Sequence, residues 1–115
     1  MKTIFLLILM TQIILGSNDF KTTQEACEDK NYDACFKTGF NYSMGYGVKT
    51  DLSKAIKYHD IACQHNHYEA CRYIGVIYYL YDLKMQDLVK AKQYFTKACK
   101  GGDKASCEMK DMIQK

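Results

Sequence analysis

Six cysteines recur at a fixed spacing, and this spacing constrains the fold more than any other feature of the 115-residue chain. The cysteines form three pairs: Cys27 and Cys35, Cys63 and Cys71, and Cys99 and Cys107. Within each pair the separation is 8 residues, and from pair to pair it is 36 residues. A fixed period of this length is typical of an array of structural repeats, each of which packs against its neighbours.

The other residues follow the same period. Residues 27–62 align without gaps to residues 63–98 and agree at 12 of 36 positions, where most of the shared residues are small or aromatic. Residues 99–115 begin a third, partial copy. We therefore predict one all-helical domain over residues 17–115, with units near 27–62 and 63–98 and a partial unit at 99–115.

Each unit contains two stretches in which small and apolar residues recur at helical spacing. In the first unit these are Ala34, Cys35, Gly39 and Tyr42, and then Ala55, Tyr58, Ile61 and Ala62. They predict helices over residues 31–44 and 52–64. Asp51 and its equivalent Asp87 precede the second helices, where a short acidic side chain can accept the free N–H groups of the first turn. The small residues predict a close approach of the two helices, with tyrosines filling the space around the crossing.

The cysteine pairing follows from distance. Six cysteines allow fifteen pairings. Eight residues of continuous helix span about 12 Å, whereas the Cα atoms of a disulfide lie within about 7 Å, so each pair must straddle a turn. We predict the disulfides Cys27–Cys35, Cys63–Cys71 and Cys99–Cys107, each joining the end of one helix to the start of the next. A metal site is the competing interpretation, but the chain has no Cys-x-x-Cys motif.

The first sixteen residues have the pattern of a secretory signal peptide. Lys2 precedes an apolar stretch, and Gly16 provides a small residue before a cleavage site at Ser17. The alternative is a membrane anchor, but the apolar run is shorter than the roughly 20 residues that a span needs. Six cysteines in the remaining chain fit an oxidising compartment. We therefore expect a secreted or periplasmic protein with no membrane span once the signal peptide is removed.

The charge of the chain is nearly balanced. The formal net charge is +3, and removal of the leader with Lys2 leaves about +2. This excess is too small to indicate nucleic acid or an anionic membrane surface as a partner.

Two sequence runs resemble a known family. Residues 51–55, Asp-Leu-Ser-Lys-Ala, and residues 45–48, Gly-Tyr-Gly-Val, are similar to motifs of the Sel1-like repeat, a relative of the tetratricopeptide repeat. The 36-residue period with paired cysteines narrows the resemblance to the Helicobacter cysteine-rich protein type. It implies an all-α fold, a right-handed α/α solenoid of about two helical-hairpin repeats with flanking half-repeats. Lys30 and Asn66 depart from the family, which usually has glycine there, and the loop at residues 81–83 lacks the glycines.

The resemblance also implies a penicillin-binding β-lactamase, but the sequence carries no catalytic motif. None of the four serines is followed by lysine three residues later, as a serine β-lactamase requires. The run 37–39, Lys-Thr-Gly, falls inside a predicted helix, where Gly39 is explained by packing. His59, His65 and His67 form no metal-ligand pattern, and we expect His65 and His67 to be exposed beside a turn. We predict no catalytic residue, no metal and no cofactor.

Binding is the use that stacked helix pairs suggest, since they form a curved surface with a concave face. The leading hypothesis is a module that binds a peptide, a protein or a peptidoglycan-type cell-wall fragment. The residues expected on the concave face are Asp33, Phe36, Phe40, Ser43, Met44, Glu69, Arg72, Val76, Tyr79 and Leu80. These residues could instead pack against a second copy or a cap. The alternatives are β-lactam hydrolysis and a purely structural protein.

Overall fold

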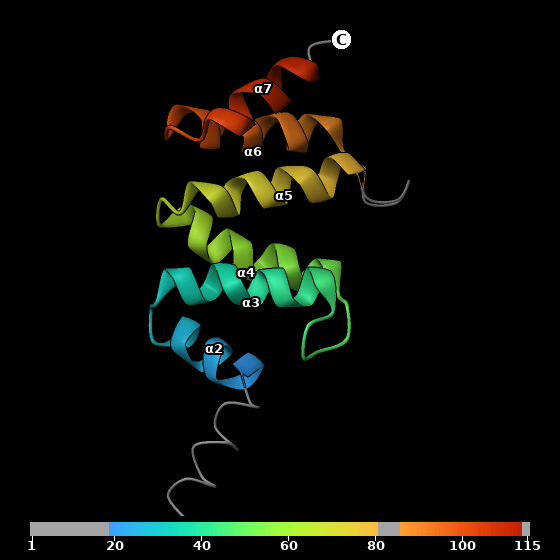
Figure 1. Ribbon diagram of the computed structural model, residues 1–115. Coiled ribbons are helices and arrows are strands. Elements are labelled where there is room, and N and C mark those ends of the chain that lie inside the picture. Colours follow the sequence, from blue (N-terminus) through green and yellow to red (C-terminus); the bar gives the residue numbers. More distant parts are fainter. Residues whose placement is uncertain (1–18, 81–85, 114–115) are drawn as a thin grey trace, which may run out of the picture.

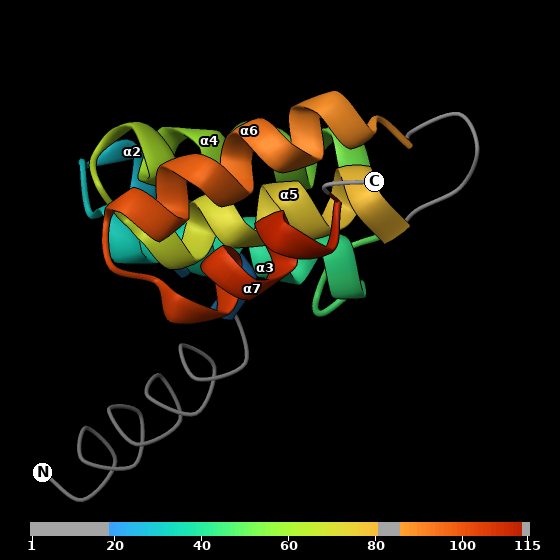
Figure 2. The same cartoon turned by 90° about the horizontal axis from the view of Figure 1, so that it is seen from above.

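The computed structural model describes residues 19–80 and 86–113, which form six α-helices and no strand. The helices are α2 (Asp19–Glu28), α3 (Tyr32–Met44), α4 (Leu52–Gln64), α5 (Tyr68–Leu80), α6 (Leu88–Lys100) and α7 (Lys104–Met112). They stack one upon another from α2 to α7 (Figure 1). Seen along the stack, α2, α4 and α6 lie on one side and α3, α5 and α7 on the other (Figure 2). The all-α repeat predicted from the period is confirmed.

The predicted starts of the second helices, after Asp51 and Asp87, are also confirmed. Asp51 Oδ1 accepts a hydrogen bond of 3.0 Å from the backbone N–H of Lys54, and Asp87 Oδ1 accepts an equivalent bond of 3.0 Å from Lys90. Each cap satisfies a donor that the helix itself leaves free, which stabilises the helix by about 1 kcal/mol. α3 begins one residue later than predicted, because Asn31 caps it through the backbone N–H of Ala34.

The three disulfides have the predicted pairing. Cys27–Cys35 joins α2 to α3, Cys63–Cys71 joins α4 to α5, and Cys99–Cys107 joins α6 to α7, with Cα–Cα distances of 4.5, 4.8 and 4.7 Å. Each bridge spans a turn that contains one residue in the left-handed region. This residue is Lys30 (φ 69°) in the first turn, Asn66 (φ 68°) in the second and Gly102 (φ 103°) in the third.

Small residues allow the two helices of a hairpin to approach, as predicted. A Cβ atom at Gly39 of α3 would lie 2.7 Å from the ring of His59 on α4, and one at Gly75 of α5 would lie 2.6 Å from the ring of Phe95 on α6. Tyrosine pairs fill the space beside these crossings. The rings of Tyr42 and Tyr58 stack at 5.6 Å, and those of Tyr78 and Tyr94 stack at 6.1 Å.

A repeated hydrogen bond holds α2, α4 and α6 in register. Gln24 Nε2 of α2 donates to the Tyr58 hydroxyl of α4 at 2.7 Å. One repeat later, the Tyr94 hydroxyl of α6 donates to Asp60 Oδ1 of α4 at 3.4 Å. Burial, and then the neighbouring Asp60 carboxylate, raise the pKa of Tyr94 to about 12, so this hydroxyl keeps its proton. α2 and α4 therefore each receive a tyrosine from the next helix of this layer.

No helix within residues 19–80 and 86–113 is both long enough and apolar enough to cross a bilayer. The predicted signal peptide at residues 1–16 lies outside the described residues, as does the second loop at residues 81–83.

Candidate binding groove

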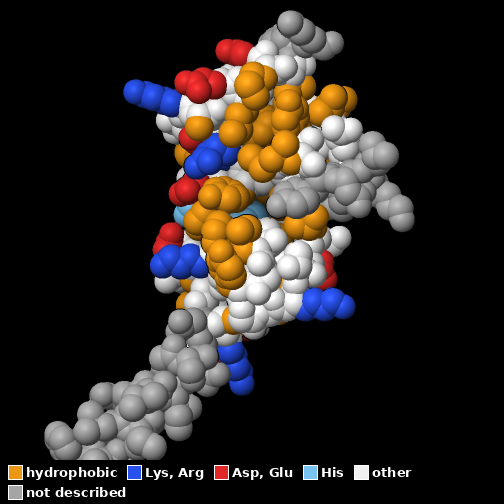
Figure 3. All heavy atoms as spheres, turned by 45° about the vertical axis from the view of Figure 1, so that its right-hand side comes forward, with side chains coloured by type: hydrophobic (Ala, Val, Ile, Leu, Met, Phe, Trp, Pro, Cys, Tyr) orange, Lys and Arg blue, Asp and Glu red, His pale blue; other side chains and the backbone are white. Residues whose placement is uncertain are grey.

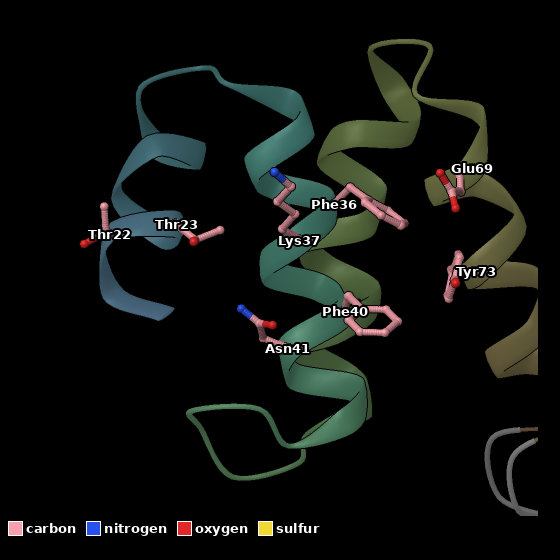
Figure 4. Close-up of a pocket in the computed structure, with 8 residues that line it drawn as sticks. All are labelled: Thr22, Thr23, Phe36, Lys37, Phe40, Asn41, Glu69 and Tyr73. Atoms are coloured by element: carbon pink, nitrogen blue, oxygen red, sulfur yellow. The ribbon is translucent and has the colours of Figure 1, made fainter. Parts of the chain in front are cut away.

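A groove of about 480 Å³ lies over α3 and extends to α2 and α5. Its lining residues are Thr22, Thr23, Phe36, Lys37, Phe40, Asn41, Glu69 and Tyr73. Phe36 and Phe40 lie on the side of α3 that faces α5, whereas Lys37 and Asn41 lie on the side that faces α2 (Figure 4). The groove therefore has an aromatic side and a polar side, separated by the axis of one helix.

Three half-buried aromatic rings form the aromatic side. The ring of Tyr73 meets the edges of Phe36 and Phe40 at centroid distances of 5.3 and 5.9 Å. The Arg72 guanidinium lies 5.3 Å from the centroid of Tyr73. Because these rings pack on one another and on the helices behind them, they present apolar surface in a fixed arrangement.

Charged side chains border the groove as ion pairs, of which Lys37–Asp33 is exposed and Arg72–Asp103 is half-buried. Lys37 Nζ lies 3.2 Å from Asp33 Oδ2, and Arg72 bridges Glu69 at 3.4 Å and Asp103 at 2.8 Å. Hydrogen bonds from Lys37 and from His67 lower the pKa of Asp33. Because Lys37 and Glu69 are themselves exposed, their pairs contribute little stability, and both side chains can exchange their present partners for a ligand at low cost.

His67 corrects an expectation, because it is not exposed. Its side chain is 21% accessible, and its ring stacks on Phe36 at 4.8 Å. Its Nδ1 accepts a hydrogen bond of 3.3 Å from the backbone N–H of Ala70 in the first turn of α5. The aromatic stack and this helix-capping bond hold the ring half-buried. His65 is exposed as expected.

His59 lies directly behind the aromatic side and is fully buried. Its ring lies 5.3 Å from Phe36 and 5.6 Å from Tyr73, and neither ring nitrogen has a hydrogen-bond partner within the described part of the chain. Desolvation, and then the nearby His67, lower the pKa of His59 to about 4. The ring is therefore neutral at pH 7. The repeat alignment carries the signal for this burial, since His59 stands where the next unit has Phe95.

The structure brings part of the predicted set together. Phe36, Phe40 and Glu69 line the groove, and Asp33 and Arg72 border it through the ion pairs described above. The other predicted residues do not line it: Ser43, Met44, Val76, Tyr79 and Leu80. Sequence reasoning missed Tyr73 on the aromatic side and the whole polar side, which consists of Thr22, Thr23, Lys37 and Asn41.

Thr38 and Gly39 of the Lys-Thr-Gly run lie in the packing between α3 and α4, whereas Lys37 lines the groove and Ser43 bonds within its own helix. Thr38 is fully buried and donates its hydroxyl proton to the Ala34 carbonyl at 2.8 Å, and Gly39 faces His59. The Ser43 hydroxyl donates to the Phe40 carbonyl at 2.9 Å. Within the described ranges no three His, Cys, Asp or Glu side chains are grouped so that they could hold a metal ion.

Comparison with known proteins identifies the repeat. The family model described as the Sel1 repeat matches residues 33–67 and 69–103, which together make up more than half of the chain. The chain belongs to the Sel1 repeat family. The two matched Sel1 repeats begin 36 residues apart, in agreement with the cysteine period. They contain all but the first residue of α3 and of α5, the helices that supply most of the groove.

Two solved structures are similar to this chain. A Sel1 repeat protein from Oxalobacter formigenes is 30% identical over 79% of this chain, with a TM-score of 0.74. Cysteine-rich protein B of Helicobacter pylori is 31% identical over 78% of this chain, with a TM-score of 0.70. The chain spans 37% of the first protein and 68% of the second. No curated protein sequence matches it.

Proposed function

We propose that this Sel1 repeat protein is an extracytoplasmic binding module that holds an extended peptide segment of a partner protein in the groove over α3. The observation that carries the proposal is the fixed aromatic side, in which Phe36, Phe40 and Tyr73 pack on one another and remain half-exposed. Concave faces of helical repeats commonly receive extended partners in this way.

The polar groups around the rings suit a peptide. Apolar side chains of a ligand would contact Phe40 and Tyr73, while Lys37 and Asn41 on the other side of α3 offer donors to its backbone carbonyl groups. Glu69, at the α5 border, offers an acceptor to a basic side chain. The arrangement needs no covalent step, and binding energy would come mainly from the aromatic rings, as at other protein interfaces.

The disulfides support a location outside the cytoplasm. All six cysteines are paired, and such bridges persist in oxidising compartments. They also hold the turns between helices, which keeps α3 and α5 in place without a ligand. This preorganisation lowers the entropic cost of binding.

Selection of peptides from a displayed random library on the oxidised protein, followed by calorimetric titration, tests the proposal. Phe40→Ala and Tyr73→Ala are each expected to lower the affinity for the selected peptide by about tenfold or more. Tyr79→Ala is the matched control, because Tyr79 is also half-buried but lies outside the groove. Equal loss in all three variants, or binding of soluble muropeptides but no peptide, would contradict a peptide groove.

A further inference from the structure

A second apolar surface lies at the far end of the stack from α2. A hollow of about 600 Å³ is lined by Leu88, Val89, Lys92, Gln93, Thr96 and Ile113. The Val89 side chain is 69% exposed, and Met112 beside Ile113 is 62% exposed. Figure 3 shows hydrophobic side chains gathered at this end, where α6 and α7 lie. We refer to the six lining residues as the α6 face.

The repeat itself shows what kind of element this face receives. Asp60 of α4 accepts the hydroxyl of Tyr94 from α6, and Gln24 of α2 donates to the hydroxyl of Tyr58 from α4. Thr96 is the equivalent of Asp60 and Gln24 in the 36-residue period. The α6 face is therefore equivalent to the surfaces of α2 and α4 that each contact a tyrosine from the next helix of the same layer.

The occupant is not a further Sel1 hairpin in the usual position. In such a hairpin α7 would be the first helix, and the second helix would pack closely against it, as α6 packs against α5 where Phe95 meets Gly75. In α7 the position equivalent to Gly75 is Asp111, and the position equivalent to the buried Ile74 is Lys110. A charged side chain in the place of glycine prevents this approach. The occupant must rest on α6 and Ile113 and stay away from that part of α7.

The charges define the chemistry of the occupant. α6 carries four lysines and no acidic residue. Three of them, Lys92, Lys97 and Lys100, stand where α4 has Ile56, Ile61 and Gln64. A second copy of the chain would bring its own lysines against the lysines of α6 and be repelled.

We propose that the α6 face docks an acidic amphipathic helix of another protein, with its apolar side on Leu88, Val89 and Ile113 and its carboxylates beside the lysines. This surface is separate from the groove over α3.

A peptide based on α6, the helix that donates Tyr94 to Asp60 of α4, tests the proposal. It consists of residues 87–100 with the four lysines replaced by glutamate and Cys99 by serine, and a side-chain lactam holds it helical, because isolated helices of this length are marginal in water. Binding to the oxidised protein is followed by fluorescence anisotropy at low salt. The same peptide with its lysines retained is the charge control.

The acidic peptide is expected to bind, and the lysine peptide to bind at least about tenfold more weakly. Val89→Asn removes the apolar contact without adding a charge and is expected to weaken binding of the acidic peptide by about tenfold, whereas Ser53→Asn, the matched change at the equivalent exposed position of α4, leaves the affinity unchanged. Both side chains are exposed, so unchanged thermal unfolding verifies that the variants are folded.

Three results would overturn the proposal. The first is no anisotropy change at millimolar protein, and the second is equal affinity for the acidic and lysine peptides. The third is Val89-dependent sedimentation with phosphatidylglycerol vesicles in the absence of peptide binding, which would make the face a membrane-binding surface. Peptide binding that is lost at high salt and in Val89→Asn supports the proposal.

Discussion

His59 and Phe95 occupy equivalent positions in the two repeats, and each packs its ring against the glycine of the preceding helix. The phenylalanine needs no hydrogen bond, whereas both nitrogens of the buried histidine lack one within the described residues. His59→Phe is therefore expected to raise the free energy of unfolding at pH 7 by about 1–3 kcal/mol, the cost of an unsatisfied buried polar group. Urea unfolding of the oxidised protein measures this.

The reciprocal change is the control. Phe95→His would place an unpaired imidazole in the same packing site and is expected to lower the free energy of unfolding by a similar amount. A loss of stability in His59→Phe would contradict this account and would mean that the imidazole makes a contact that phenylalanine cannot replace.

The same histidine makes stability depend on pH. Its pKa is about 6.5 in the unfolded chain and about 4 in the folded chain, so between these values the unfolded state binds a proton that the folded state does not. Stability from this group is complete above pH 6.5 and falls as the pH decreases toward 4, by at most about 1.4 kcal/mol per pH unit.

Comparison with His59→Phe isolates this contribution, because Asp33 and other carboxylates titrate in both proteins. Urea unfolding at pH 7, 6, 5 and 4.5 is expected to show a growing stability difference in favour of His59→Phe as the pH falls. A constant difference would show that His59 does not take up a proton on unfolding.

Most of the fold could be predicted because it depends on local, periodic signals. The cysteine spacing places each pair across a turn, and Asp51 and Asp87 precede apolar stretches with helical spacing. These features need only residues close together in the sequence. Gly39 and Gly75 add the one long-range prediction, because a repeated glycine inside a helix indicates close packing.

The groove could be predicted only in part, because it combines elements that the period treats differently. Thr22 and Thr23 come from α2, a lone half-repeat with few matches to the complete units. Tyr73 and Lys37 are equivalent in the alignment and both face the preceding helices, Tyr73 toward α3 and Lys37 toward α2, but one is aromatic and the other charged, so the repeat pattern does not mark them as parts of one groove. The burial of His59 is not evident from the sequence of its own repeat, because a histidine among apolar neighbours does not identify itself as core without a structure.

The two packed glycines give a third prediction. Gly39→Ala and Gly75→Ala would each place a methyl group within 3 Å of a buried ring. Each is expected to cost about 1–3 kcal/mol of stability, although alanine is otherwise the better helix former. The oxidised variants can be compared by thermal and urea unfolding. In His59→Ala, which removes the obstructing ring, the additional Gly39→Ala change is expected to cost far less, and a loss as large as in the parent would rule out a clash with His59.

The first disulfide turn gives the last prediction. Lys30 has a φ of 69°, a conformation that costs a residue with a side chain roughly 1–2 kcal/mol, and its side chain is exposed. Lys30→Gly removes this cost but makes the unfolded chain more flexible, so a net gain of about 0.5–1 kcal/mol is expected. Gly102→Lys, at the equivalent place in the third turn, is expected to lower the free energy of unfolding by a similar amount. Nothing lies within 4 Å of a Cβ atom there, so the cost comes from the backbone conformation alone. Urea unfolding of both variants measures these opposite effects, and a loss in Lys30→Gly would show that the lysine stabilises the turn through its side chain.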